Sequence, residues 1–364
     1  MDWNASHSND IVVQMCDPRT LEVVGVLEGV ELDGSTLEWG YDTDTRFSGT
    51  IRTLGSNWIE HSALRVVHKI PEWNYSKVLA TGYVMERPWS RTQGGNVYDF
   101  TLSSSIAALK EDYIPWHFNI AKGATSHNAF TAIVSEAEGR KCRIENDAVA
   151  HIYNEAKVYE MGDSRLDDLI DICETSGNRY DVDEYGIITL SRDVNPSERG
   201  ISWTIDLGDG RTNAIDGVDG GTSKYNSPTV VVATYKGTLK DANGNTVKDG
   251  ENKSQEIELW SRIEVRGPEN SGVRGYTIAT VESVSDLNPQ TQQALDQVAQ
   301  NKANEVDTAY REWELSCLYM PIKIGECINL VIPDGVDRGS HKCFAKNISL
   351  SLDTMEMHMT LKEA

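Results

Sequence analysis

The sequence predicts an α+β protein that is mostly β, with strand patterns at both ends of the chain and helical patterns in between. From Cys317 to Leu361 apolar and polar residues alternate with the period of two that marks β-strands, and the segment divides into four strands. From Leu21 to Ser104 short apolar runs are separated by turn residues, which is typical of a β-barrel or sandwich. We therefore expect two β-rich regions around a mixed centre.

The first third of the chain is expected to form several short strands. Gly94 and Gly95 supply a tight reversal before the last of them. The expected strands run from Leu21 to Leu27, Phe47 to Arg52, Ala63 to Ile70, Lys77 to Trp89 and Asn96 to Leu102.

The centre is expected to be a compact α+β module. A helix is predicted from His127 to Glu138, and a second from Ser164 to about Ser176 with Gly177 as its stop. The first helix would bury Phe130, Ile133 and Val134; the second would bury Leu166, Leu169, Ile170 and Cys173 and leave Asp167, Asp168 and Asp171 outside. A hairpin from Tyr180 to Leu190, turning at Asp183 to Gly186, completes the module.

The last third returns to strands. They are predicted at Ile201 to Ile205, Thr229 to Tyr235 and Gln255 to Val265, with a polar loop at Asp241 to Asn252. An amphipathic helix is expected from Pro289 to Tyr310, capped by Asn288, with Leu295, Ala299, Ala303 and Val306 on one face. In the final hairpin the expected inward residues are Phe344, Ile348, Leu350 and Leu352, then Met355, Met357, Met359 and Leu361.

Composition and charge limit the classes of function. The 364 residues exceed the usual size of one hydrophobic core and suggest two or three domains. With 34 Lys and Arg against 56 Asp and Glu, the net charge of −22 disfavours binding of nucleic acid through its phosphates. Met1 to Thr20 lacks the pattern of a signal peptide, and no apolar run is long enough for a membrane span. The six cysteines are widely spaced, so reduced buried thiols are expected.

Candidate metal sites are weak. Asp181 to Gly186 resembles the start of a calcium loop, but Tyr185 and Arg192 stand where oxygen ligands belong, so a β-turn is preferred. The Asp241, Asn243 and Asn245 segment is also read as a hairpin tip, because Thr246 stands where a glycine is needed and Asn252 occupies the closing position. A zinc site from Cys317, Cys327, His341 and Cys343 has no known zinc-binding spacing. Cys327 and Cys343 fall inside expected strands, where a small apolar residue would serve, so a metal is not favoured.

Candidate catalytic sites are weaker still. The sequence has no Gly-x-Ser-x-Gly elbow and no phosphate-binding glycine motif, and among 56 acids a carboxylate pair carries no information. We therefore name no catalytic, cofactor-binding or metal-binding residue. The candidates for contact with partners are the aromatic residues Trp58, Trp73 and Trp89, each of which is more often a core residue.

The order of these elements resembles tail hub proteins, which lie at the distal end of long phage tails and of related contractile injection systems. Their relatives include the N-terminal part of prophage tail endopeptidases. The resemblance rests on the β-rich first third, the central module ending in the hairpin Tyr180 to Ile188, the Val230-Val231-Val232 strand and the turn from Met320 to Glu326.

This resemblance implies a homotrimer in which each chain supplies two tube-like β-barrel domains, at residues 1–111 and 199–364, the second with an insertion around 236–315. Residues 112–198 would be the α+β module. Such a ring adapts the sixfold tail tube to threefold tip proteins and lines the DNA channel with acidic groups. Implied partners are the tail tube and distal tail proteins, the tape measure protein and a central spike or fibre, in a virion assembled in the host cytoplasm.

The same resemblance implies no enzyme activity, no cofactor, no sequence-specific binding of nucleic acid and no stable membrane insertion. Two alternatives stay open. The first is a carbohydrate-binding tail adhesin, since exposed Trp and Tyr can stack on sugars. The second is a tail-associated peptidoglycan hydrolase, which only the number of acidic residues supports.

Overall fold

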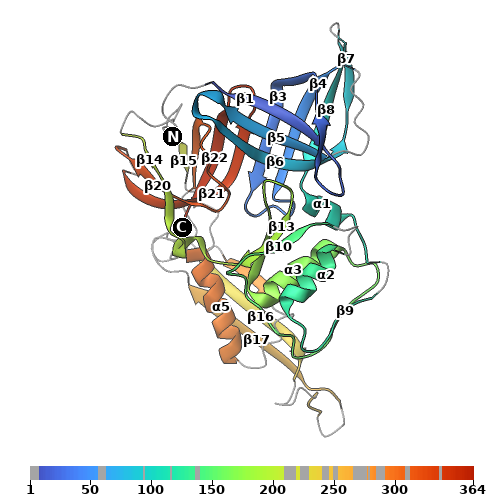
Figure 1. Ribbon diagram of the computed structural model, residues 1–364. Coiled ribbons are helices and arrows are strands. Elements are labelled where there is room, and N and C mark those ends of the chain that lie inside the picture. Colours follow the sequence, from blue (N-terminus) through green and yellow to red (C-terminus); the bar gives the residue numbers. More distant parts are fainter. Residues whose placement is uncertain are drawn as a thin grey trace. The chain divides into compact units, whose positions relative to one another are not determined.

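The computed structural model describes residues 8–55, 63–92, 95–114, 117–135, 140–208, 219–221, 229–239, 246–248, 253–264, 277, 279–283, 292–307, 312–335 and 338–364. Contacts divide the chain into two compact units. Unit 1 consists of Met1–Asp219 and Trp313–Ala364, and unit 2 is Gly220–Glu312. Figure 1 shows the elements of both.

Unit 1 contains a large sheet built from both ends of the chain. Its N-terminal strands are β1 (Asp10–Cys16), β2 (Val23–Val26), β3 (Val30–Gly40), β4 (Phe47–Leu54), β5 (Ala63–Ile70), β6 (Tyr75–Glu86), β7 (Trp89–Thr92) and β8 (Gly95–Ser103). Its C-terminal strands are β14 (Ile201–Asp206), β19 (Glu312–Leu318), β20 (Cys327–Ile332), β21 (Gly339–Ser351) and β22 (Glu356–Glu363). The short elements η1 (Pro71–Trp73), η2 (Pro196–Glu198) and β15 (Asp219–Gly221) lie between them in the sequence.

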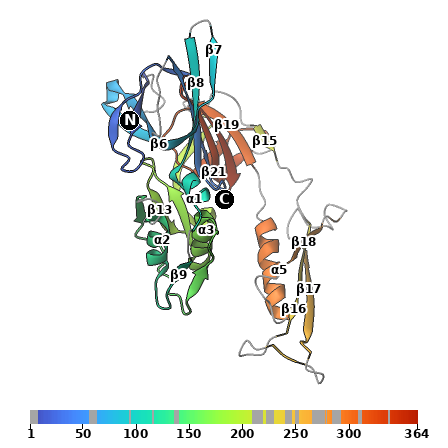
Figure 2. The same ribbon diagram turned by 90° about the vertical axis from the view of Figure 1, so that its right-hand side faces the viewer.

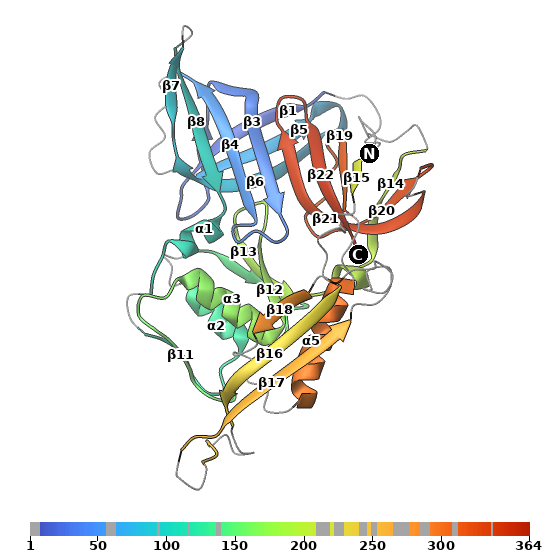
Figure 3. The ribbon, with the colours of Figure 1, turned by 180° about the vertical axis from the view of Figure 1, so that it is seen from behind.

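The N-terminal and C-terminal strands of unit 1 form one continuous sheet, in which the order is β19-β22-β21-β3-β4-β8-β6-β5-β1-β2 (Figure 3). β20 pairs with β21 and β14, and β7 pairs with β8. The prediction of an α+β, mostly β fold is confirmed. The prediction of two separate barrels is not confirmed. The N-terminal strands and the C-terminal strands share one sheet, and among the described residues no pairing joins β2 to β19 and closes that sheet.

The two strand sets join at β21 because this strand is long enough to serve both. Its first part pairs with β20 through Phe344 and the residues before it, and its second part, from Asn347 on, pairs with β3. β22 lies along its other edge. A single apolar core therefore includes residues of both sets, such as Leu37, Phe100, Trp313 and Leu350.

The final hairpin corrects one expectation. The β21–β22 register shifts between Ala345 and Asn347, so the strand bulges at Lys346 and the alternation changes phase. Cys343 and Ala345 face the core before the bulge, and Ile348 and Leu350 face it afterwards. Phe344, predicted to point inward with Ile348, lies outside that core cluster and packs on Tyr41, with 5.2 Å between ring centres.

The α+β module follows α1 (Ser105–Lys110) and contains two helices and short strands. The elements are β9 (Phe118–Ile120), α2 (Ser126–Ser135), β10 (Cys142–Ile144), β11 (Lys157–Tyr159), α3 (Arg165–Ser176), β12 (Asn178–Val182) and β13 (Ile188–Arg192). The predicted hairpin is confirmed, since β12 pairs antiparallel with β13. Its core packs Phe130, Ile133, Leu169 and Leu190 together.

The predicted second helix is confirmed with its caps. Ser164 accepts a hydrogen bond from the Leu166 N–H at the start, and Gly177 takes the left-handed conformation at the end. The prediction that Asp168 is exposed is wrong, because its side chain is buried with only 3% exposed. Asp168 follows Arg165 by one helical turn on the face that packs into the module, whereas Asp167 points outward.

Unit 2 is a small three-stranded sheet with one helix. β16 (Val230–Thr238) pairs antiparallel with β17 (Glu256–Glu264) and parallel with β18 (Ala279–Ser283). α5 (Gln292–Asp307) packs Leu295 and Ala299 against Ala233 and Tyr235. The predicted helix ends, Asn288, Pro289 and Tyr310, and the candidate loop at Asp241 to Asn245 lie outside the described residues. Among the described helices of both units, none has the length and apolar character needed to cross a membrane.

Candidate functional site: the junction of sheet and module, and the exposed strand edges

The β12–β13 hairpin holds the α+β module on the sheet of unit 1. Thr81 on β6 is buried, and its hydroxyl donates a 2.8 Å hydrogen bond to the Glu184 carbonyl in the hairpin turn. The same hydroxyl accepts a 3.1 Å hydrogen bond from the Arg65 Nε–H. Lys323 pairs with the Glu184 carboxylate at 3.2 Å. The turn predicted at Asp183 to Gly186 thus serves as a contact between parts of one unit.

A second set of contacts surrounds Tyr41, in the loop after β3. The Arg179 guanidinium lies over the Tyr41 ring at 3.5 Å from its centre, and Arg199 lies at 5.9 Å. Arg179 also donates a 2.6 Å hydrogen bond to the Tyr41 carbonyl, and Arg46 donates to the same oxygen. Burial and the neighbouring Arg46 lower the pKa of Arg179, which nonetheless stays far above neutrality for a guanidinium. Cation–π contacts therefore position the module.

A cavity of about 430 Å³ lies beside this junction. Its inner wall is apolar and includes Phe47, Leu79 and Ile348, whereas Lys77, Lys323 and Glu184 contribute charge. Burial and the adjacent Lys323 lower the pKa of Lys77. Burial alone would raise the pKa of Glu184, but a backbone hydrogen bond and Lys323 outweigh it and lower that pKa. The ion pair between Lys323 and Glu184 stabilises the hairpin.

The sheet of unit 1 has exposed edges among the described residues. β2 pairs only with β1, and Val23, Val24 and Val26 on it are exposed. β14 pairs only with β20, and Ile201 at its start is exposed. Edge strands with exposed apolar side chains are ready to pair with another chain. Contacts through edge strands are expected from the sequence, but which strands are the edges is not, because the pattern of a strand does not tell which of its edges is covered.

The three candidate contact tryptophans differ. Trp58 lies outside the described residues, and Trp73 is half-buried in η1. Trp89, in β7, is 66% exposed. Of the two that can be placed, Trp89 is therefore the one with most of its ring free for contact with a partner.

The candidate metal ligands are not brought together as a site. No group of three His, Cys, Asp or Glu in the described ranges is arranged to hold a metal ion. Cys317, Cys327 and Cys343 are buried thiols, and His341 packs against Trp313 at 4.9 Å between ring centres. The Asp183 carboxylate accepts hydrogen bonds from the Tyr185 and Ile187 N–H groups. An aspartate that bonds to the backbone a few residues further on is typical of a turn.

One polar arrangement was missed by sequence reasoning. On adjacent strands β19 and β22, the Ser316 hydroxyl lies 2.7 Å from the His358 Nδ1, and the His358 Nε2 lies 3.6 Å from the Glu356 carboxylate. A cavity of about 410 Å³ borders Ser316 and His358. The alternating patterns of β19 and β22 predict that Ser316 and His358 point outward, but their contact follows only once the two strands are known to be neighbours. Serine, histidine and carboxylate are the groups of a nucleophilic triad, although His358 is half-exposed.

Comparison with known proteins finds structures with a similar fold but no match at the level of sequence. No family model matches the sequence, and no curated protein matches it. The structure is similar to a 43 kDa tail protein of prophage MuSo2 from Shewanella oneidensis, with a TM-score of 0.64, 14% identity and coverage of 97% of this chain and 98% of the other. A tail protein from Neisseria meningitidis MC58 has a TM-score of 0.66 and 12% identity, covering 98% and 97%.

A third structure, prophage tail protein gp18 from Listeria monocytogenes EGD-e, has a TM-score of 0.54 and 11% identity, covering 98% of this chain and 94% of that one. The chain thus has the fold of phage tail proteins. The resemblance to a tail hub type of protein that the sequence predicts is confirmed at the level of the fold.

Proposed function

We propose that this chain is a structural protein of a phage tail. The observation that carries the proposal is the similarity to two prophage tail proteins over nearly the full length of both partners, with TM-scores of 0.64 and 0.66. The junction around Tyr41 and Thr81 fits a structural role, because it fixes the module on the sheet through contacts that have no chemical step.

In more detail, the chain acts as a trimeric hub at the distal end of the tail. Each copy brings two strand sets joined at β21 and β3, so three copies present six sets to a hexameric tail tube. The ring adapts sixfold to threefold symmetry. We assign the tube-like domains to residues 1–111 and 199–364, with the insertion around 236–315, and the α+β module to residues 112–198.

Charge supports a role in lining the DNA channel. Three copies carry a formal charge of −66, and acidic groups on the channel wall let DNA slide through without binding. The partners are the tail tube and distal tail proteins, the tape measure protein and a central spike or fibre, met during virion assembly in the host cytoplasm. The role requires no catalysis and no cofactor.

Electron microscopy of the purified full-length chain tests this function. The expected class averages show a threefold ring with a central bore, and the ring binds the hexameric tail-tube protein encoded in the same genome. Particles without threefold symmetry, together with no binding to the tube, would contradict the hub role.

Two alternative functions are each supported by one observation. The exposed Trp89 favours a carbohydrate-binding adhesin, which a glycan array with the wild-type chain and Trp89→Ala would detect. The contact between Ser316 and His358 favours a hydrolase, which requires turnover of cell-wall material that is lost in Ser316→Ala. Absence of glycan binding and of turnover would leave the structural role.

A further inference from the structure

The hairpin of β7 and the first half of β8 extends the sheet of unit 1 beyond its other strands (Figure 2). We define the arm as residues 89–92 and 95–98, in which Trp89 pairs with Tyr98 and Arg91 with Asn96. β7 has no second neighbour among the described strands, and all four of its residues are exposed. The arm therefore has one free edge, along β7, and the β7 side chains are exposed on both faces.

One face of the arm continues the inner face of the sheet. Along β8 the inward residues are Leu102 and Phe100, both buried, followed by Tyr98, which packs against the edge of the core. Trp89 stands opposite Tyr98, and directly paired residues of an antiparallel ladder point to the same face. Trp89 thus extends the row of inward apolar side chains past the end of the core, where it is 66% exposed.

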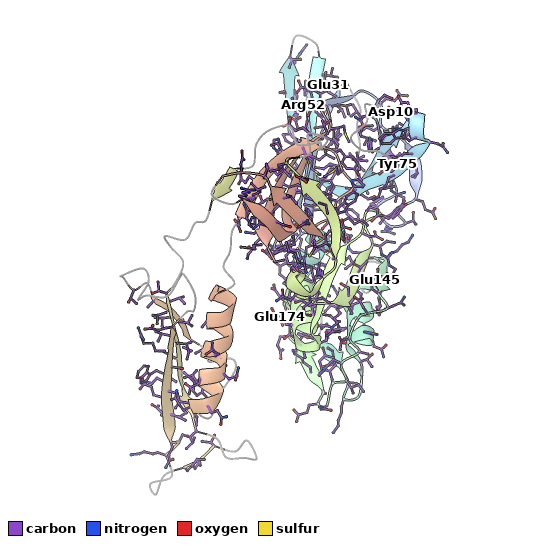
Figure 4. The ribbon with its side chains drawn as sticks, turned by 90° about the vertical axis from the view of Figure 1, so that its left-hand side faces the viewer. Asp10, Glu31, Arg52, Tyr75, Glu145 and Glu174 are labelled. Carbon is purple, nitrogen blue, oxygen red and sulfur yellow. The ribbon has the colours of Figure 1, made fainter. Side chains whose placement is uncertain are left out.

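The arm is also basic. Arg91 lies two residues after Trp89, on the same face, and no ion pair of Arg91 occurs in the described part of the chain. The acid nearest in the register, Asp99, pairs with Arg52 at 2.8 Å at the base of the arm, where Figure 4 labels Arg52. Asp99 is therefore engaged elsewhere, and Arg91 keeps its charge available for a partner.

We propose that the arm docks on an acidic surface of a second copy of this chain. The partner that fits an exposed tryptophan beside an arginine combines apolar area with negative charge, and this chain, with its net charge of −22, supplies such surfaces. The α+β module is the most suitable part: residues 112–198 contain 17 acidic against 8 basic side chains, and Glu145 and Glu174 are labelled on it in Figure 4.

An arm that binds a different surface of the next copy makes a head-to-tail contact, and such contacts close into a ring when the rotation between copies allows it. The inference rests on the proposed hub function and names the element that would join neighbouring copies. Trp89 supplies the apolar anchor, and Arg91 supplies the charge that selects an acidic partner.

Native mass spectrometry of the full-length chain tests the arm through the variants Trp89→Ser and Arg91→Glu, with Arg19→Glu as the matched control. Arg19 is an exposed arginine outside the arm. Because anchor residues of this type contribute about 2 kcal/mol or more at each contact, we expect each arm variant to raise the concentration for half-assembly by at least about 30-fold. The control should assemble like the wild type. Added salt should weaken assembly of the wild type and of Trp89→Ser, which both keep Arg91, and should not weaken assembly of Arg91→Glu.

The possible outcomes distinguish a failure of the arm proposal from a failure of the hub function. If the wild type forms a ring and both arm variants form it equally well, the docking role of the arm is overturned and the hub function stands. If the wild type is monomeric at every concentration, self-docking and the ring are both overturned. If the variants assemble normally but lose binding on a glycan array, the arm serves a sugar and the proposal is wrong. Unchanged thermal unfolding of the variants shows that any loss of assembly is not a loss of folding.

Discussion

The Arg179 guanidinium lies 3.5 Å from the centre of the Tyr41 ring and donates a hydrogen bond to the Tyr41 carbonyl, across 138 positions of sequence. It stacks on the ring and satisfies a backbone oxygen at the same time, which a lysine cannot do because its ammonium lacks the planar fork. This contact joins β12 of the α+β module to the loop after β3.

Replacing Arg179 therefore weakens the junction. We expect Arg179→Lys to lower the free energy of unfolding by about 1–2 kcal/mol, since a lysine cannot keep the stack and the hydrogen bond together. Urea unfolding measures the loss, and Arg192→Lys, at an exposed position on β13, is the control with a change below about 0.5 kcal/mol. Equal stability of the two variants would show that the stack on Tyr41 contributes nothing.

The Thr81 hydroxyl is a second point of attachment. Thr81→Val keeps the shape of the side chain but removes the donor to the Glu184 carbonyl and the acceptor of Arg65. We expect a loss of about 1–3 kcal/mol on thermal or urea unfolding, because buried polar groups are left without partners. Thr81→Ser retains the hydroxyl and should lose much less, so a serine variant as unstable as the valine variant would contradict this explanation.

Asp168 makes stability depend on pH. Burial, with the neighbouring carboxylates Asp163, Asp171 and Asp167, raises the pKa of Asp168 to about 7, whereas the nearby Arg165 opposes the rise. The folded chain therefore holds a proton that the unfolded chain releases above its ordinary pKa. The contribution of this group is fully present below about pH 4 and is lost as the pH rises to about 7.

Asp168→Asn removes this dependence. Relative to the wild type, we expect the variant to be equally stable near pH 4 and more stable above pH 7, by up to about 4 kcal/mol for a shift of about three pKa units. Urea unfolding at several pH values measures the difference, with exposed Asp167→Asn as the control. A difference between Asp168→Asn and the wild type that is independent of pH would contradict the assignment.

The cysteines are expected to react slowly in the folded chain. Burial raises the pKa of Cys173, Cys317 and Cys343 to about 12, so their reactive thiolate forms are scarce at neutral pH. Cys142 is the one thiol that is only partly buried. Alkylation followed by mass spectrometry should label Cys142 first, and Cys142→Ser should abolish the fast phase; rapid labelling of Cys317 or Cys343 would show that the core opens.

Local patterns predicted much of the fold, because they depend on neighbours in the sequence. The helix from Arg165, with Ser164 and Gly177 at its ends, and the hairpin of β12 and β13 follow from capping, spacing and turn residues. Phe344 is buried as expected, but its placement on the same face as Ile348 was predicted wrongly, because the bulge at Lys346 has no signature in an alternating pattern.

Features that depend on distant partners were not predicted. The stack of Arg179 on Tyr41 and the bond from Thr81 to Glu184 arise only when the module meets the sheet. The burial of Asp168 runs against the expectation that charged residues stay outside. The single sheet was missed as well, since the pairing of β21 with β3 joins residues about 300 positions apart, and no local pattern carries such a register.

The mass of the native full-length chain tests the hub assignment most directly. Native mass spectrometry over a concentration series should show three copies of the 40.4 kDa chain as the dominant species at high concentration. A chain that stays monomeric at every concentration, or that forms dimers and no trimer, would contradict the threefold ring on which the proposed hub function depends.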